Sequence, residues 1–142
     1  MLLRKILGID YGEKRTGLAQ TDDDKIIAVP LETVETKKIF KYLNENFKKN
    51  SVESFVIGEP KTLDDKPASI SKKINLFCER LFKIYKKPIY RIDERFTSKI
   101  AFQSVLSMKL KKTKREDKKL IDKLSATLIL QSHLDRIKIN KK

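Results

Sequence analysis

Short apolar runs near the start of the chain predict three neighbouring β-strands. They cover residues 2–10, 16–21 and 26–34, and polar turns at Gly12 and at residues 22–24 separate them. The links are too short for crossover connections, so the three strands should form an antiparallel meander. Pro30 interrupts the third run and has no N–H to donate, which predicts an edge position for that strand.

Beyond the third strand, the spacing of the apolar residues changes to that of a helix. Helices are predicted from Thr36 to Asn50, from Ile70 to Tyr85, from Thr97 or Ser98 to Val105, and from Thr113 onward. Two further strands are predicted between helices, at residues 54–58 and 88–92. This order predicts an α/β fold with a mixed five-stranded sheet, in which an antiparallel meander is joined to parallel crossover units and flanked by helices.

The composition of the chain narrows its class. Its 142 residues, 39% of them hydrophobic, suffice for a single domain spanning residues 1–142. Lys and Arg outnumber Asp and Glu by 33 to 19, a formal net charge of +14, which favours binding to RNA or DNA ahead of an anionic membrane. No apolar run approaches the ~20 residues that span a bilayer, and the first residues lack the layout of a signal peptide. A cytoplasmic protein is therefore expected.

The scarcity of Cys and His leaves carboxylates as the side chains that could bind a metal ion. Cys78 and His133 are single, which excludes a disulfide framework, a Cys-rich zinc site and ligation by a His pair. Open α/β sheets place their sites outside the carboxyl ends of their strands. Acids stand at the ends of three predicted strands, at Asp10, Glu59 and the pair Asp93-Glu94.

These acids also have structural explanations. Asp10 ends an apolar strand, where a buried carboxylate needs a partner or a cation, but it could instead begin the turn at Gly12 through its own hydrogen bond. Strand alternation allows only one of Asp93 and Glu94 to share the face of Asp10, and ion pairs at the surface could explain both. Gly8, on the same face as Asp10, leaves room for another backbone or a substrate.

Asp122 is a further candidate, near the start of the last predicted helix. The apolar run that follows indicates a buried helix, in which an acid needs a partner. Three carboxylates converging from strand ends and a helix would suit Mg²⁺ or Mn²⁺ in a two-metal site, with ions about 3.5–4 Å apart. Such a site, with the basic charge, predicts phosphodiester hydrolysis. The basic stretch at residues 109–119, which includes Lys111, Lys112 and Lys114, would neutralise backbone phosphates and would be a solvated loop in the free protein.

Four blocks of sequence, in order, resemble the YqgF/RuvX family. They are ILGIDYGEKRTGLA at 6–19, VIGEP at 56–60, DERFTS at 93–98, and IDKLSA followed by LILQS at 121–132. The resemblance implies a ribonuclease H-like fold, in agreement with the predicted order of elements. Members of the family are described as nucleases that mature the 5′ end of pre-16S rRNA, and also as Holliday-junction-resolvase-like. Nucleic acid, and with it ribosomal precursor particles, would then be the partner.

The resemblance also implies roles for individual residues. The acids that match the family's are Asp10, Glu94 and Asp122, which would be the catalytic residues and the metal ligands. The matching positions that would face the nucleic acid are Lys14, Arg15, Arg95 and Thr97. The chain departs from the family at Glu59, where an apolar residue is usual. This extra acid could join the metal shell or repel phosphate, so the ligand set stays open.

Three other functions compete with a ribonuclease. A resolvase-like endonuclease would act on branched DNA, and a non-catalytic assembly factor would hold rRNA on the same face. The spacing of Asp10, Gly12 and Gly17 also resembles the first phosphate loop of actin-like ATPases and sugar kinases, whose backbone N–H groups approach phosphate. Those enzymes close a nucleotide between two such domains, and 142 residues supply one.

Overall fold

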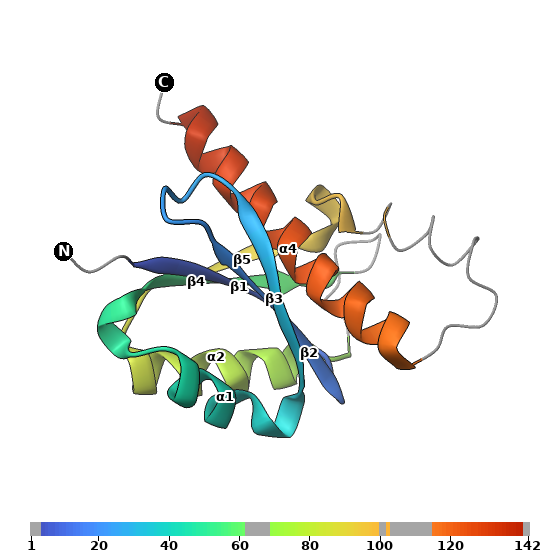
Figure 1. The fold of residues 1–142 in the computed structure, drawn as a ribbon. Helices are drawn as coiled ribbons and strands as arrows, with labels where there is room; N and C mark the ends of the chain where they lie inside the picture. The colour runs from blue at the N-terminus through green and yellow to red at the C-terminus, as the bar shows by residue number, and fades with distance from the viewer. Residues whose placement is uncertain (1–3, 62–68, 100–101, 103–114, 141–142) are drawn as a thin grey trace.

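A five-stranded sheet with helices on both faces forms the framework of the computed structural model, which describes residues 4–61, 69–99, 102 and 115–140 (Figure 1). The strands are β1 (Lys5–Asp10), β2 (Arg15–Thr21), β3 (Ala28–Glu35), β4 (Val52–Glu59) and β5 (Ile89–Asp93). The α-helices are α1 (Ile39–Asn46), α2 (Ser71–Tyr85) and α4 (Arg115–Asn140), and 3₁₀ turns lie at Thr36–Lys38, Lys49–Ser51 and Glu94–Phe96.

The order of the strands puts β1 at the centre of the sheet. Across the sheet the order is β3-β2-β1-β4-β5. The pairs β1–β2 and β2–β3 are antiparallel, whereas β1–β4 and β4–β5 are parallel. The predicted mixed sheet is therefore confirmed, with its meander and its crossovers through α1 and α2. Pro30 lies in the edge strand β3, as predicted, near a register shift in the pairing with β2.

Some predicted element boundaries are wrong. The first helix was expected to extend from Thr36 to Asn50, but α1 covers only Ile39–Asn46, because Phe47 already has an extended backbone. The segment after β5 begins with a 3₁₀ turn at Glu94–Phe96, which Asp93 caps by accepting a hydrogen bond from the Arg95 N–H. The cap predicted at Thr113 and most of the helix predicted after Thr97 lie outside the described residues.

The two faces of the sheet are packed differently. Helices α1 and α2 cover one face, and α4 crosses the other (Figure 1). The α1/α2 face holds a core of large side chains, including Leu7, Phe55 and Leu81. The core beneath α4 includes Ala19 and Ala126. A Cβ on Gly8 would lie 2.7 Å from Leu130 Cβ and 3.0 Å from the Ala126 carbonyl oxygen, so the space that Gly8 leaves is filled by α4.

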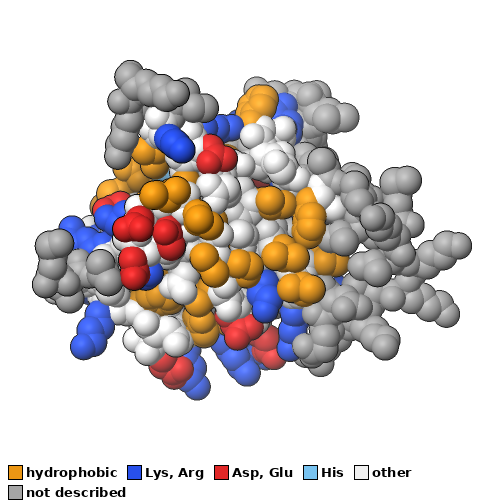
Figure 2. Space-filling view, turned by 45° about the horizontal axis from the view of Figure 1, so that its top comes forward, with side chains coloured by type: hydrophobic (Ala, Val, Ile, Leu, Met, Phe, Trp, Pro, Cys, Tyr) orange, Lys and Arg blue, Asp and Glu red, His pale blue; other side chains and the backbone are white. Residues whose placement is uncertain are grey.

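The surface has no element suited to a bilayer among the residues described. No described helix is long and apolar enough to cross a membrane. On the face shown in Figure 2, basic side chains are interspersed with acidic and apolar ones and do not form one dense patch. Ile26 and Ile27, in the turn between β2 and β3, contribute exposed apolar surface.

Candidate active site

The candidate site is built around Asp10, the last residue of the central strand β1. Asp10 points to the α4 face of the sheet, as does Gly8 two residues earlier. On one side, Asp10 pairs with Gly17 of β2. On the other side, Ile9 pairs with Ile57 of β4, so that Gly58 follows beside Asp10. The Asp10 carboxylate therefore stands between two residues that have no side chain.

Gly17 makes the space that Asp122 of α4 occupies. A Cβ on Gly17 would lie 2.0 Å from the backbone carbonyl oxygen of Asp122, closer than any side chain could come. The start of α4 can therefore rest directly on β2 only because residue 17 is glycine. Since Gly17 is the strand partner of Asp10, this contact brings Asp122, 112 positions later in the sequence, to the same end of the sheet.

Gly58 makes the corresponding space for Glu94. A Cβ on Gly58 would lie 2.6 Å from Glu94 Oε1. Glu94 follows β5 directly, and its side chain is buried over β4. Asp93 points away from it: its carboxylate accepts hydrogen bonds from the Arg95 side chain, at 2.7 Å from Nη2, which holds the pKa of Asp93 below its ordinary value. Of the two acids that the sequence could not separate, Glu94 joins Asp10 and Asp93 forms the ion pair.

A buried lysine joins the first two acids. Lys99 Nζ lies 2.9 Å from Asp10 Oδ1 and 2.6 Å from Glu94 Oε1. All three side chains are at most 13% exposed. Burial alone would lower the pKa of Lys99, but the negative charges of Asp10 and Glu94 outweigh it, and the net result is a raised pKa.

The pKa of Asp10 is raised well above its ordinary value of 3.8. Removal of its carboxylate from water is the largest effect and raises its pKa; Lys99 opposes it, while the charges of Glu94 and Asp122 add to it, and the pKa reaches about 6. The influence of Asp122 indicates that all three acids share one electrostatic environment. A carboxyl group poised this way is a common mark of a functional site.

Arg15 is the partner of the third acid. Its Nε donates a 2.7 Å hydrogen bond to Asp122 Oδ2 from the first residue of β2. The Arg15 side chain is 37% exposed and that of Asp122 is 23% exposed. The sequence predicted that Arg15 would face nucleic acid, whereas here it neutralises an acid of the site.

The donor chemistry of the three acids suits Mg²⁺ or Mn²⁺, which prefer carboxylate oxygens. Across residues 4–61, 69–99, 102 and 115–140, however, no group of three or more His, Cys, Asp or Glu side chains is close enough to hold a metal ion. Asp10 and Glu94 meet around Lys99, and Asp122 lies near them but binds Arg15. The structure thus brings the predicted acids to one end of the sheet, where each contacts a basic side chain and Asp10 and Glu94 share a single lysine.

The other predicted residues have local roles in the structure. The Thr97 hydroxyl donates to the Glu94 carbonyl oxygen and accepts from the Lys99 N–H, so it orders the turn that carries Glu94 and Lys99. Arg95 binds Asp93. Glu59 forms a 3.1 Å ion pair with Arg91, which neutralises the Glu59 carboxylate. Lys14 is exposed in the turn between β1 and β2. Lys111, Lys112 and Lys114 lie outside the described residues.

Sequence reasoning missed Lys99 and the part played by Gly17 and Gly58. A lysine two residues after Thr97, at the start of a predicted helix, resembles any solvated surface charge. The signal that could have pointed to Lys99 is the excess of acids at the strand ends, because their negative charges need a basic partner where they are buried. Gly17 and Gly58 could have been singled out as glycines inside strands, where close approach of another group is a common reason for them.

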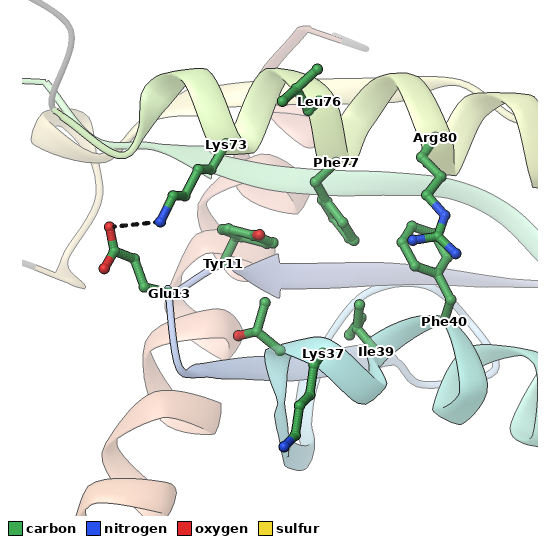
Figure 3. Close-up of a pocket in the computed structure, with 10 residues that line it drawn as sticks. Tyr11, Glu13, Lys37, Ile39, Phe40, Lys73, Leu76, Phe77 and Arg80 are labelled. Carbon is green, nitrogen blue, oxygen red and sulfur yellow. Dashed lines mark hydrogen bonds and ion pairs between the residues drawn. The ribbon is translucent and has the colours of Figure 1, made fainter.

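A basic groove opens at the same end of β1, on the α1/α2 face. It has a volume of about 470 Å³ and lies between α2 and the start of α1 (Figure 3). The lining residues include Tyr11, Lys37, Phe40, Lys73, Phe77 and Arg80. Arg80 stacks on the Phe40 ring at 4.2 Å, and Lys73 lies 3.3 Å from Glu13. A second depression, lined by Glu13, Lys14, Arg15, Glu35 and Lys37, continues from this groove toward the Arg15–Asp122 pair.

A family model described as RuvX: Holliday junction resolvase matches residues 4–136. The chain belongs to the RuvX family. Among its relatives, a protein of Christiangramia forsetii is 47% identical over 93% of this chain and 98% of its own length. Another, from Flavobacterium johnsoniae, is 45% identical over 92% of this chain and 95% of its own length. Both relatives are named "Putative pre-16S rRNA nuclease".

A solved structure confirms the fold of this RuvX family member. The chain matches T. thermophilus RuvC, solved in complex with a Holliday junction substrate, with a TM-score of 0.56 and 17% sequence identity over 96% of both chains. At that identity the match establishes the architecture alone. The ribonuclease H-like fold that the sequence blocks implied is therefore confirmed.

Proposed function

We propose that this chain is a nuclease that hydrolyses phosphodiester bonds, depends on Mg²⁺ or Mn²⁺, and acts in the cytoplasm on the 5′ end of pre-16S rRNA. The observation that carries the proposal is the convergence of Asp10, Glu94 and Asp122 around Gly17 and Gly58, in a chain whose relatives are named for this activity. The protein would bind this RNA within ribosomal precursor particles.

In this proposal the three acids hold the cation through carboxylate oxygens. A divalent ion bound there would lower the pKa of a coordinated water to near neutral and would stabilise the charge that develops on the leaving oxygen. Thr97 keeps Glu94 in place through its hydrogen bond to the Glu94 carbonyl oxygen. Arg15 pairs with Asp122 in the structure, and if Asp122 held a cation instead, the partly exposed Arg15 side chain would be free to bind a phosphate.

The nucleic acid would follow the basic surface beside the acids. The exposed Lys14 lines the second depression together with Arg15 and Lys37. Lys37 also lines the basic groove, with Lys73 and Arg80 (Figure 3). Lysine and arginine side chains along such a path bind the phosphate backbone without reading its sequence. Further phosphate contacts would come from Lys111, Lys112, Lys114 and Arg95, which the sequence alone assigns to this role.

Two alternatives rest on particular observations. A resolvase-like activity on branched DNA is favoured by the description of the matching family model. A non-catalytic rRNA-binding assembly factor is favoured by the occupation of all three acids by Lys99 and Arg15. The substrate and the metal dependence of cleavage distinguish the three functions.

The test compares the wild type with Asp10→Asn on a labelled precursor of the 16S 5′ leader and on a four-way DNA junction. Each substrate is incubated with Mg²⁺, Mn²⁺ or EDTA. Loss of even an outer partner of a metal ligand typically costs 10–100-fold, so replacing the central carboxylate should lower cleavage by more than about 100-fold. Asp23→Asn is the matched control, because Asp23 is 65% exposed and pairs with Lys5 at the other end of β1.

The outcomes separate the proposals. Metal-dependent cutting of the RNA that Asp10→Asn loses and Asp23→Asn keeps supports the ribonuclease. Cutting of the junction alone supports the resolvase-like activity. Tight RNA binding without cleavage of either substrate supports the assembly factor, and equal cleavage by Asp10→Asn and wild type contradicts the assignment of Asp10.

A further inference from the structure

The acids of the site differ in how firmly their basic partners are held. The Lys99 side chain is 11% exposed and bridges two carboxylates, Asp10 at 2.9 Å and Glu94 at 2.6 Å. The Arg15 side chain is 37% exposed and contacts one carboxylate, that of Asp122. Displacing Lys99 would require a buried ammonium group to leave two partners, whereas Arg15 can exchange its single partner for water or phosphate at the surface.

Resting on the proposed metal-dependent function, we propose that Lys99 is a permanent substitute for one of the two ions that three carboxylates would otherwise bind. Its ammonium group fills the position between Asp10 and Glu94. The remaining carboxylate oxygens of the cluster would then hold a single divalent cation, for which Asp122 would have to give up its ion pair with Arg15. Lys99 supplies the second positive charge.

The charge of the cluster agrees with a single ion. Asp10, Glu94 and Asp122, when ionised, carry three negative charges, and Lys99 cancels one of them. One divalent cation in place of Arg15 brings the cluster to neutrality. Two divalent cations together with Lys99 would leave two uncompensated positive charges among side chains that are mostly buried, which is strongly unfavourable.

The turn that carries Lys99 is built to hold the ammonium group in this position. Thr97 accepts a hydrogen bond from the Lys99 backbone N–H at 3.3 Å and donates one to the Glu94 carbonyl oxygen at 2.9 Å. Glu94 and Lys99 are therefore fixed relative to each other by the backbone as well as by their ion pair. Gly58 leaves the space into which Glu94 Oε1 projects, at the position where a side chain would otherwise stand.

The proposal is tested by counting bound Mn²⁺ ions by electron paramagnetic resonance on the purified, substrate-free protein. We expect one ion per chain in the wild type and two in Lys99→Met. Lys5→Met is the matched control: Lys5 pairs with Asp23 at 2.7 Å at the far end of β1, so this variant should bind one ion, as the wild type does. Arg15→Met should also bind one ion, because Arg15 is expected to yield to the cation in the wild type.

Several results would overturn this inference. Two ions of similar affinity in the wild type contradict it directly, and this count does not depend on whether any variant folds. An unchanged count in folded Lys99→Met contradicts it as well. In both cases, metal-dependent RNA cleavage that Asp10→Asn abolishes would leave the proposed function standing. No Mn²⁺ binding in any variant, together with cleavage in EDTA, would overturn both.

Discussion

The two faces of the sheet are formed by the same strands, but aromatic and other large side chains are more frequent on one face than on the other. Toward α1 and α2 the strands present large side chains such as Leu7, Ile9 and Phe55, which are almost fully buried. Toward α4 the neighbouring positions include Gly8 and Gly17, which let the helix backbone approach closely. At the end of that face stand the acids. Because successive side chains of a strand point to opposite faces, one face of the sheet holds much of the apolar core and the other carries the candidate active site.

The difference between the two faces indicates which substitutions should affect stability and which should affect activity. Large apolar groups exclude water and stabilise the fold, but they leave no room for a buried cluster of charges. Small residues contribute less apolar burial and give the backbone of α4 access to the sheet. The stability of the protein should therefore depend mostly on the α1/α2 face, and its activity on the α4 face.

Leu81→Ala should have the largest effect on stability. Leu81 of α2 is fully buried in the core of the α1/α2 face, and such truncations cost about 2–5 kcal/mol, through lost burial and the cavity left behind. Urea unfolding measures this loss. Leu76→Ala on the same helix is the control, because Leu76 is 63% exposed and the change should be within about 0.5 kcal/mol. Equal losses in the two variants would contradict the division between the faces.

Gly17→Ala should affect stability less and activity more. The new methyl group would meet the Asp122 backbone, so α4 must move away from β2, at a cost of about 1–3 kcal/mol. The same movement takes Asp122 from Asp10, and cleavage should fall well below that of Leu81→Ala assayed at a temperature where both variants are folded. Full cleavage by Gly17→Ala would show that the contact of α4 with Gly17 does not position the site.

The last expected effect is a dependence of stability on pH. Burial raises the pKa of Asp10 to about 6 in the folded protein, from an ordinary value of 3.8. Between pH 4 and 6 the folded state therefore keeps a proton that the unfolded state has lost, and this contribution to stability falls as the pH rises. Asp10→Asn lacks the group, so its free energy of unfolding should increase relative to the wild type across this range.

Urea unfolding of both proteins at several pH values measures this difference. Asp23→Asn is again the control, since Asp23 lies at the surface and its replacement should leave the pH dependence unchanged. A difference between Asp10→Asn and the wild type that stays constant from pH 4 to 6 would show that burial does not hold the proton on Asp10. A difference that shrinks as the pH rises would show that the folded state favours the ionised form of Asp10 and not the protonated form.

The sequence predicted the sheet well because its signals are local. Apolar runs and short turns identified β1 to β3, and Pro30 placed β3 at the edge. The end of α1 was predicted four residues too late, at Asn50 instead of Asn46, because the polar residues after Asn46 continue a helical composition while the backbone is already extended at Phe47. Local pattern cannot detect that change, which depends on where β4 must begin.

The sequence predicted the acids of the candidate site, but it did not predict the basic residues that pair with them. Asp10 could be found because a carboxylate at the end of an apolar strand is unusual. The choice between Asp93 and Glu94 needed the backbone turn after β5, which directs Asp93 to Arg95 and Glu94 to the space over Gly58. Nothing in the local sequence distinguishes Lys99 from the many lysines at the surface.

The sequence alone determined the order of the elements, the basic charge, the carboxylate chemistry and the family resemblance. Only the tertiary structure decided which charges meet. Asp10 and Lys99 are 89 residues apart in the chain, and Arg15 and Asp122 are 107 apart. Contacts at such separations depend on strand register and on how closely α4 approaches the sheet, and both are set by the packing of the whole domain.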